Sequence, residues 1–143
     1  MASTETIKVR DVMTPNPVEL PLTASAMDAA KAMRDSDIGA VVVGDGKGVC
    51  GIVTDRDLVV RAVADGKDPG RVKLEEICSR DLSGCSPDDG LEQAITLMRD
   101  KALRRLLVID GMRAVGIVSI GDLAQRIDSS SVLGQISSAH PNR

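Results

Sequence analysis

Apolar positions along the chain form short runs whose spacing alternates between that of strands and that of helices. The run Val18–Leu22 predicts a short extended stretch, and Pro21 restricts it to an edge or a loop because proline cannot donate a ladder hydrogen bond. Apolar residues at helical spacing follow between positions 27 and 33, after Thr23 or Ser25, either of which can cap a helix. The other elements predicted for this half are strands at Ala40–Val43 and Val49–Val53, an Asp45-Gly46 turn between them, and a helix at about Asp55–Ala64.

The same series of elements returns 65 residues later, because a shift of that length aligns the two halves without a gap. Gly51-Ile52-Val53-Thr54 then falls on Gly116-Ile117-Val118-Ser119, and Asp57 falls on Asp122. The elements predicted for this second half are a helix at 91–98 capped by Asp88 or Asp89, strands at Leu106–Ile109 and Ala114–Val118 around an Asp110-Gly111 turn, and a helix at Ile120–Ile127. A half of about 60 residues buries only ~60% of its surface and is marginal alone, so we expect the halves to share a core.

The repeat predicts a mixed α/β (α+β) fold made of two βαββα repeats related by pseudo-two-fold symmetry. We expect the first repeat at 8–64 and the second at 72–128. The Gly- and Asp-rich segment 65–71 is the expected linker, and 129–143 is a polar C-terminal tail.

Composition excludes several classes of function. The 143 residues include no Phe, Tyr or Trp, so the core must be aliphatic and no aromatic platform for single-stranded nucleic acid is possible. The formal net charge of −3 gives no basic footprint for nucleic acid, and no apolar run is long enough for a membrane span. A polar N-terminus without a signal sequence predicts a cytoplasmic protein. Cys50, Cys78 and Cys85 form no C-x-x-C, and only His140 could join them, so we expect reduced thiols and no metal site.

Two turns combine a hydroxyl with a carboxylate three residues later: Thr54 with Asp57, and Ser119 with Asp122. Both pairs fit a capping box, which explains them as helix caps worth ~1 kcal/mol. The same geometry also suits a ribose-phosphate, because a helix N-terminus attracts phosphate and a carboxylate can accept from ribose hydroxyls. The sequence leaves both interpretations open.

The turns belong to a longer pattern. Its other elements are Asp11-Val12-Met13-Thr14, Asp37-Ile38-Gly39-Ala40 and Leu103-Arg104-Arg105-Leu106. Over roughly Val9–Ile127 the chain resembles a pair of cystathionine-β-synthase (CBS) domains, the arrangement often called a Bateman module. The resemblance implies a module with two clefts between the repeats. In that family such clefts often bind AMP, ATP or S-adenosylmethionine and regulate an attached or partner protein.

The resemblance also implies roles for individual residues. Asp57 and Asp122 would bind ribose, and Thr54 and Ser119 would lie near phosphate. The residues implied to line the base pocket or the adjoining walls are Thr14, Val18, Ile38, Gly39, Ala40, Cys85, Arg104 and Arg105.

Three departures make the two halves unequal. The second half lacks the Asp-x-Met-Thr-x-x-Pro entry of the first and has Glu76-Ile77-Cys78-Ser79-Arg80-Asp81-Leu82 instead, and Gly121 stands where the first half has Arg56. Arg104-Arg105 stands where the first half has Gly39-Ala40. These two arginines suit either a solvated strand start or a phosphate contact. For Arg56 a salt bridge on the helix face is favoured.

We therefore predict a stand-alone regulatory or sensor module that binds an adenosine-containing ligand (AMP, ATP or S-adenosylmethionine). We also expect it to act on an unknown protein partner and to form a homodimer. The alternative is a structural dimerisation or interaction module that binds no nucleotide. An enzyme is not predicted, because no nucleophile–base pair is visible, and no cofactor is required.

Overall fold

Two runs of buried aliphatic residues form the centres of two β-sheets. The computed structural model describes residues 7–127, which divide into two compact units. The central unit is Pro17–Leu82, and the outer unit combines residues 7–16 with residues 83–127. The predicted tail at 129–143 lies outside the described residues.

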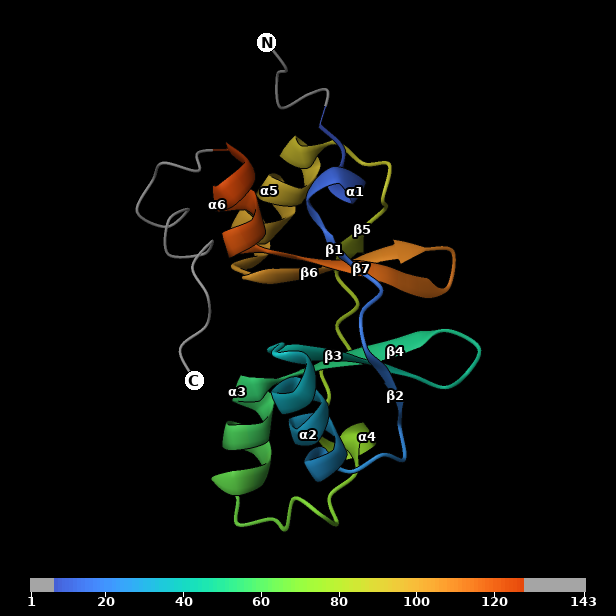
Figure 1. Ribbon diagram of the computed structural model, residues 1–143, viewed down its shortest axis with the longest axis vertical. Helices are drawn as coiled ribbons and strands as arrows, with labels where there is room; N and C mark the ends of the chain where they lie inside the picture. The colour runs from blue at the N-terminus through green and yellow to red at the C-terminus, as the bar shows by residue number, and fades with distance from the viewer. Residues whose placement is uncertain (1–6, 128–143) are drawn as a thin grey trace. The chain divides into compact units, whose positions relative to one another are not determined.

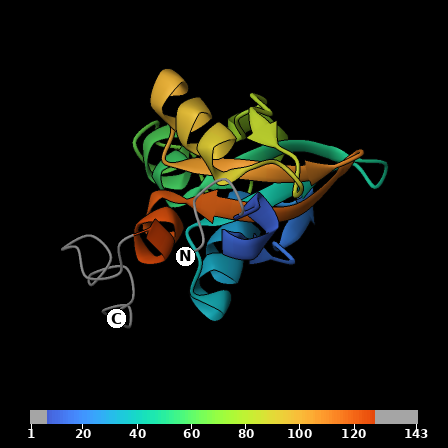
Figure 2. The same ribbon diagram turned by 90° about the horizontal axis from the view of Figure 1, so that it is seen from above.

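The central unit contains a three-stranded sheet in the order β2-β3-β4. All five residues of β3 (Ala40–Gly44) are buried, as the continuous apolar run requires. Strand β4 (Val49–Thr54) pairs with β3 in an antiparallel hairpin, whose loop projects beyond the helices (Figure 2). Strand β2 (Glu19–Pro21) is parallel to β3 and lies at the edge of the sheet, where proline is tolerated.

Two helices of this unit begin at caps that the sequence predicts. Helix α2 (Ala26–Ser36) begins after Ser25, whose Oγ accepts the Asp28 N–H at 3.1 Å. Helix α3 (Asp55–Asp57) continues as the π-helical segment η2 (Leu58–Val63), so the helix predicted at 55–64 is only partly α-helical. Helix α4 (Leu74–Ile77) completes the unit.

The outer unit contains a four-stranded sheet in the order β1-β7-β6-β5. Strands β6 (Arg105–Asp110) and β7 (Arg113–Ser119) form the predicted hairpin. The flanking strands are β1 (Thr14–Pro15), antiparallel to β7, and β5 (Gly84–Cys85), parallel to β6. Figure 1 shows the helices of this unit on one face of the sheet: α1 (Val9–Val12), α5 (Leu91–Lys101) and α6 (Ile120–Ile127).

The predicted cap of α5 is wrong. Gly90 is the N-cap residue, and the Gln93 side chain accepts its N–H at 2.8 Å. Asp89 instead accepts the Ser86 N–H at 2.8 Å, and Asp88 pairs with Arg10. Both carboxylates are used one turn earlier, in the loop that leads into the helix.

Each unit takes a short helix from outside its own βαββα run. The N-terminal segment that carries α1 packs in the outer unit, where Val9 is fully buried. The segment that carries α4 packs in the central unit, where Leu74 and Ile77 are fully buried. The boundaries of the compact units therefore differ from those of the sequence repeats. Each unit contains a segment that belongs to the other repeat.

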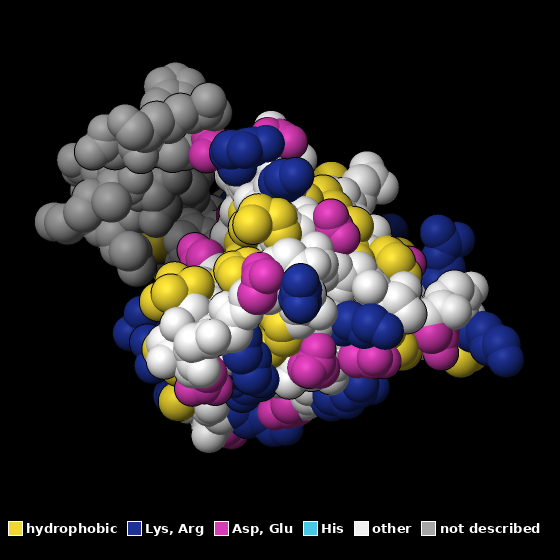
Figure 3. All heavy atoms as spheres, turned by 90° about the horizontal axis from the view of Figure 1, so that it is seen from below, with side chains coloured by type: hydrophobic (Ala, Val, Ile, Leu, Met, Phe, Trp, Pro, Cys, Tyr) yellow, Lys and Arg dark blue, Asp and Glu magenta, His cyan; other side chains and the backbone are white. Residues whose placement is uncertain are grey.

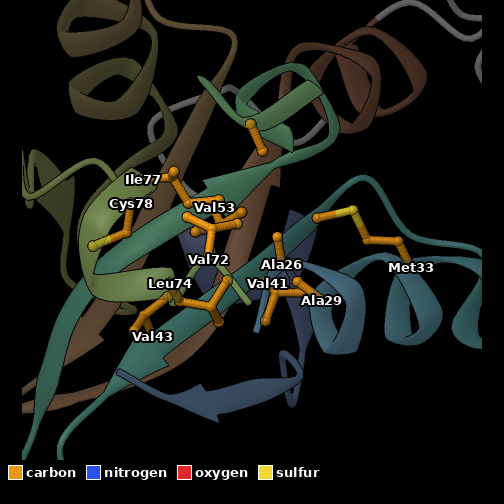
Figure 4. Packing of buried hydrophobic residues seen from close by; sticks show 11 residues of the cluster. Ala26, Ala29, Met33, Val41, Val43, Val53, Val72, Leu74, Ile77 and Cys78 are labelled. Atoms are coloured by element: carbon orange, nitrogen blue, oxygen red, sulfur yellow. The ribbon is translucent and has the colours of Figure 1, made fainter. Parts of the chain in front are cut away.

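The buried cluster of each unit combines residues of both sequence halves, so the halves share apolar cores as expected. Figure 4 shows the aliphatic cluster of the central unit, in which Ile77 of α4 and the adjoining Cys78 join residues of α2, β3 and β4. A second cluster, which includes Val9 and Leu106, fills the outer unit. Helices α1 and α4 add buried apolar side chains to these cores, which a repeat of about 60 residues could not fill well alone. Within the described residues, no helix is both long and apolar enough to cross a membrane.

Candidate functional site

The first hydroxyl–carboxylate turn joins β4 to α3. Thr54 Oγ1 accepts the Asp57 N–H at 3.3 Å, and Asp57 Oδ2 accepts the Thr54 N–H at 2.9 Å. The Thr54 hydroxyl also lies 3.1 Å from Asp57 Oδ2, to which it can donate. The Asp57 side chain is only 17% exposed. The predicted capping box is confirmed, and it holds the carboxylate in one orientation.

The second turn joins β7 to α6 and repeats this geometry. Asp122 Oδ2 accepts the Ser119 N–H at 2.9 Å, and Ser119 Oγ accepts the Asp122 N–H at 3.1 Å. Both side chains are half-buried. The same local sequence therefore builds the same hydrogen-bonded pair in both units.

The residues before the neighbouring strand complete each turn. In the central unit Gly39 O accepts the Asp55 N–H at 3.0 Å, and Ala40 lies opposite Thr54 in the β3–β4 ladder. In the outer unit Arg104 O accepts the Ile120 N–H at 3.0 Å, as Gly39 O does for its helix. Gly39-Ala40 and Arg104-Arg105 thus occupy equivalent places beside the two turns.

The two turns differ in the amides that they leave open. At α3, the second N–H, from Arg56, is bonded by Asp55 Oδ1 at 2.9 Å, so all three N–H groups of this short helix are satisfied. At α6, the equivalent amide belongs to Gly121, which has no acceptor among residues 7–127. A free amide at a helix N-terminus is a donor that an anion can use.

The predicted site residues form a separate group in each unit. Thr54, Asp57, Gly39 and Ala40 lie together in the central unit, while Val18 O accepts the Val42 N–H at 2.9 Å inside the sheet. Ile38, like Val18, is partly buried against the core.

In the outer unit Ser119, Asp122, Arg104 and Arg105 lie together, because Arg105 is opposite Ser119 in the β6–β7 ladder. Thr14 is exposed in β1 and lies opposite Ile117, two residues before Ser119 along β7.

Cys85 lies apart from the outer turn. It is opposite Val108, at a buried position of the β5–β6 pair. Burial raises the pKa of the Cys85 thiol to about 11, with a smaller contribution from Asp89. At neutral pH this thiol is therefore uncharged.

The arginines near the turns make few contacts with the rest of the described chain. Arg104 is exposed and Arg105 half-buried, and neither forms an ion pair in the part of the chain that the structure describes. The salt bridge predicted for Arg56 is not formed among the described residues either. Arg61, which was not predicted as a site residue, lies with its Nε 3.7 Å from Asp57 Oδ1. Its i+4 spacing from Asp57 was the signal that could have identified it.

An open pocket of about 410 Å³ lies on the outer unit, away from both turns. It is lined by Gly84, Cys85, Asp89, Glu92, Gln93, Thr96, Leu97 and Asp100. Three carboxylates in this lining oppose the binding of a phosphate. In the described ranges no group of three or more His, Cys, Asp or Glu residues could hold a metal ion.

Comparison with known proteins agrees with this architecture. The CBS domain family model matches residues 9–63 and 74–129. The CBS domain-containing protein YhcV of Bacillus subtilis is 35% identical over 116 residues, which cover 81% of this chain and 82% of that protein.

Solved structures share the fold. Hypoxic Response Protein I with two coordinated zinc ions has a TM-score of 0.74 and 28% identity, covering 85% of this chain and all of that one. The CBS domain pair of protein MJ0100, in complex with 5′-methylthioadenosine and S-adenosyl-L-methionine, has a TM-score of 0.77 and 24% identity. The match covers 87% of this chain and 98% of that one. With two matches that together span most of its length, the chain belongs to the CBS domain family and carries a tandem pair of these domains.

Proposed function

We propose that the protein is a regulatory module that senses an adenosine-containing ligand: AMP, ATP or S-adenosylmethionine. The observation that carries this proposal is the recurrence of one hydroxyl–carboxylate pair at the same strand-to-helix turn of both units. A related CBS pair of the same fold is complexed with two adenosine derivatives, which supports this ligand class. The ligand would act as a signal, and no catalytic role is proposed.

Each part of the ligand has a matching group on the chain. Asp57 and Asp122 would accept hydrogen bonds from ribose hydroxyls, since a carboxylate is an acceptor with several lone pairs. Thr54 and Ser119 would lie beside the phosphate. The aliphatic and backbone surfaces of Ile38 and of the other predicted wall residues would hold the adenine, because the chain has no aromatic side chain.

The two turns offer a phosphate different numbers of free donors. In the outer unit the Gly121 amide has no acceptor among residues 7–127, and Arg104 and Arg105, whose backbones lie beside the turn, form no ion pair within that range. The central unit has no open amide in the first turn of α3. We therefore propose that the turn of the outer unit binds the phosphate-bearing ligand more tightly.

Isothermal titration calorimetry with AMP, ATP and S-adenosylmethionine tests the proposal. The conservative variants Asp57→Asn and Asp122→Asn should each abolish one binding event, because they remove a charge but keep the shape of the turn. Asp65→Asn removes an exposed carboxylate from the same chain and is the matched control. Absence of heat and of thermal stabilisation with all three ligands at millimolar concentration would overturn the proposal.

A second candidate function rests on exposed apolar residues. Val59, Val60 and Val63 of η2 are 59%, 43% and 60% exposed. Figure 3 shows hydrophobic side chains lying among charged groups of both signs on one face of the molecule. Such residues suit a homodimer contact or an as yet unknown protein partner. Light scattering should show a dimer that Val60→Asp converts to a monomer, and a native monomer would count against the homodimer.

A further inference from the structure

The two oxygens of the Asp57 carboxylate are used differently. Oδ2 lies within hydrogen-bond distance of both the Thr54 N–H and the Thr54 hydroxyl, at 2.9 and 3.1 Å. These two bonds fill the usual capacity of one carboxylate oxygen. Oδ1 is therefore the oxygen left for a ligand hydroxyl, and it faces Arg61 Nε at 3.7 Å.

Arg61 is held on its other side by the backbone. Its Nη1 donates to Ile77 O, the last carbonyl of α4, at 3.1 Å. The guanidinium group is half exposed, while the carboxylate that it faces is mostly buried. One arginine thus connects the acid of the turn to the end of α4, a double contact that the forked donors of a guanidinium make possible.

Among residues 7–127 the outer unit has no equivalent contact. Arg126 has the same i+4 spacing from Asp122, but it is exposed and no ion pair joins the two within the described chain. Within residues 7–127 Asp122 forms no ion pair, whereas Asp57 lies in ion-pair range of Arg61. The two acids therefore present different electrostatic surroundings to the same kind of ligand.

We propose that Arg61 is a positioning and specificity-determining residue for the ligand that binds at Asp57. It lies in ion-pair range of Oδ1 and offsets its negative charge, so that a phosphate-bearing nucleoside is accepted beside an acid that would otherwise repel it. This inference rests on the proposed function. It predicts that Arg61 controls the preference for AMP over adenosine, two ligands that differ only in the phosphate group.

Calorimetric titration of AMP and adenosine tests this in an Asp122→Asn background, where the turn of the outer unit is disabled. Arg61→Gln should lower the ratio of AMP affinity to adenosine affinity roughly tenfold, the size expected when one charge-assisted contact is lost. Arg61→Lys keeps the charge and should restore most of the preference. Arg71→Gln removes an exposed arginine that pairs with Asp68 in the same unit, and it should leave the ratio unchanged.

A merely structural role would weaken both ligands equally, so an unchanged ratio in Arg61→Gln overturns the assignment of Arg61 alone. If the Asp122→Asn protein binds neither ligand while the native protein binds AMP, the inference fails and the proposed function stands for the outer unit. If the native protein binds neither, both fail. The ¹⁵Nε resonance of Arg61 reports the contact without ligand: it should shift in Asp57→Asn, and an unmoved resonance would overturn the contact.

Discussion

Gly51 in β4 lies against the backbone carbonyl of Ser79, so closely that a Cβ atom on Gly51 would stand 2.5 Å from that oxygen. Ile52 and Ser79 exchange backbone hydrogen bonds of 3.0 and 2.9 Å beside this contact. Gly116 makes the equivalent approach in the outer unit, where its Cβ would meet Met13 and the carbonyl of Thr14. Each Gly-Ile-Val motif thus begins with glycine because another segment packs directly against that residue. The segment is Cys78-Ser79 at Gly51 and Met13-Thr14 at Gly116.

The first prediction concerns this close approach. Gly51→Ala should destabilise the protein by about 1–3 kcal/mol, because the new methyl group meets backbone that cannot rotate away. Urea unfolding measures the loss. Gly70→Ala in the same unit is the control, since its Cβ would meet only a side-chain oxygen of Asp68 at 3.4 Å. Equal stability of the two variants would contradict the contact.

The sequence predicts the local structure well, because local structure depends on nearby residues. The valine run of β3 is fully buried, and Ser25, Thr54 and Ser119 are at the predicted turns. The position of the N-terminal segment could not be predicted, since packing α1 beside β7 requires contacts about a hundred residues apart in the chain.

In the candidate site, too, features that depend on neighbouring residues could be predicted, and features that depend on distant contacts could not. The two capping boxes follow from four residues each. The contact of Arg61 with Ile77 O depends on where α4 packs, which no nearby residue encodes. The π-helical segment η2 could not be predicted from the repeat, because the equivalent helix α6 in the other unit is α-helical.

The second prediction concerns pH. The backbone N–H of Ser25 is bonded by Asp28, and this bond, followed by the Ser25 hydroxyl contact, lowers the pKa of the Asp28 carboxyl below its usual value. Because the folded-state pKa is lowered, the stabilisation is present above the unfolded pKa and is lost as pH falls below about 4. Urea unfolding at pH 6 and pH 3 measures how much the free energy of unfolding changes with pH. This change should be smaller in Asp28→Asn than in the native protein. An identical difference would exclude this carboxyl as a contributor.

The third prediction concerns thiol reactivity. Because the pKa of Cys85 is raised to about 11, only about one thiol in a thousand is ionised at pH 8. In native protein Cys85 should therefore resist alkylation by iodoacetamide for hours, and in urea it should react at the rate of a free cysteine. Peptide mass mapping measures both rates. Rapid modification of Cys85 in the folded protein would contradict its buried position in β5.

The last prediction concerns the phosphate at the outer turn. Arg105→Gln should weaken AMP binding to this turn about 5–20-fold, because a guanidinium–phosphate contact is charge-assisted and Arg105 lies opposite Ser119. The affinity of adenosine should hardly change, since it has no phosphate to lose. Arg113→Gln removes the same charge from the far end of β7 and serves as the control. Calorimetry in an Asp57→Asn background isolates the outer turn, and equal losses for Arg105→Gln and Arg113→Gln would indicate general electrostatics instead of a direct contact.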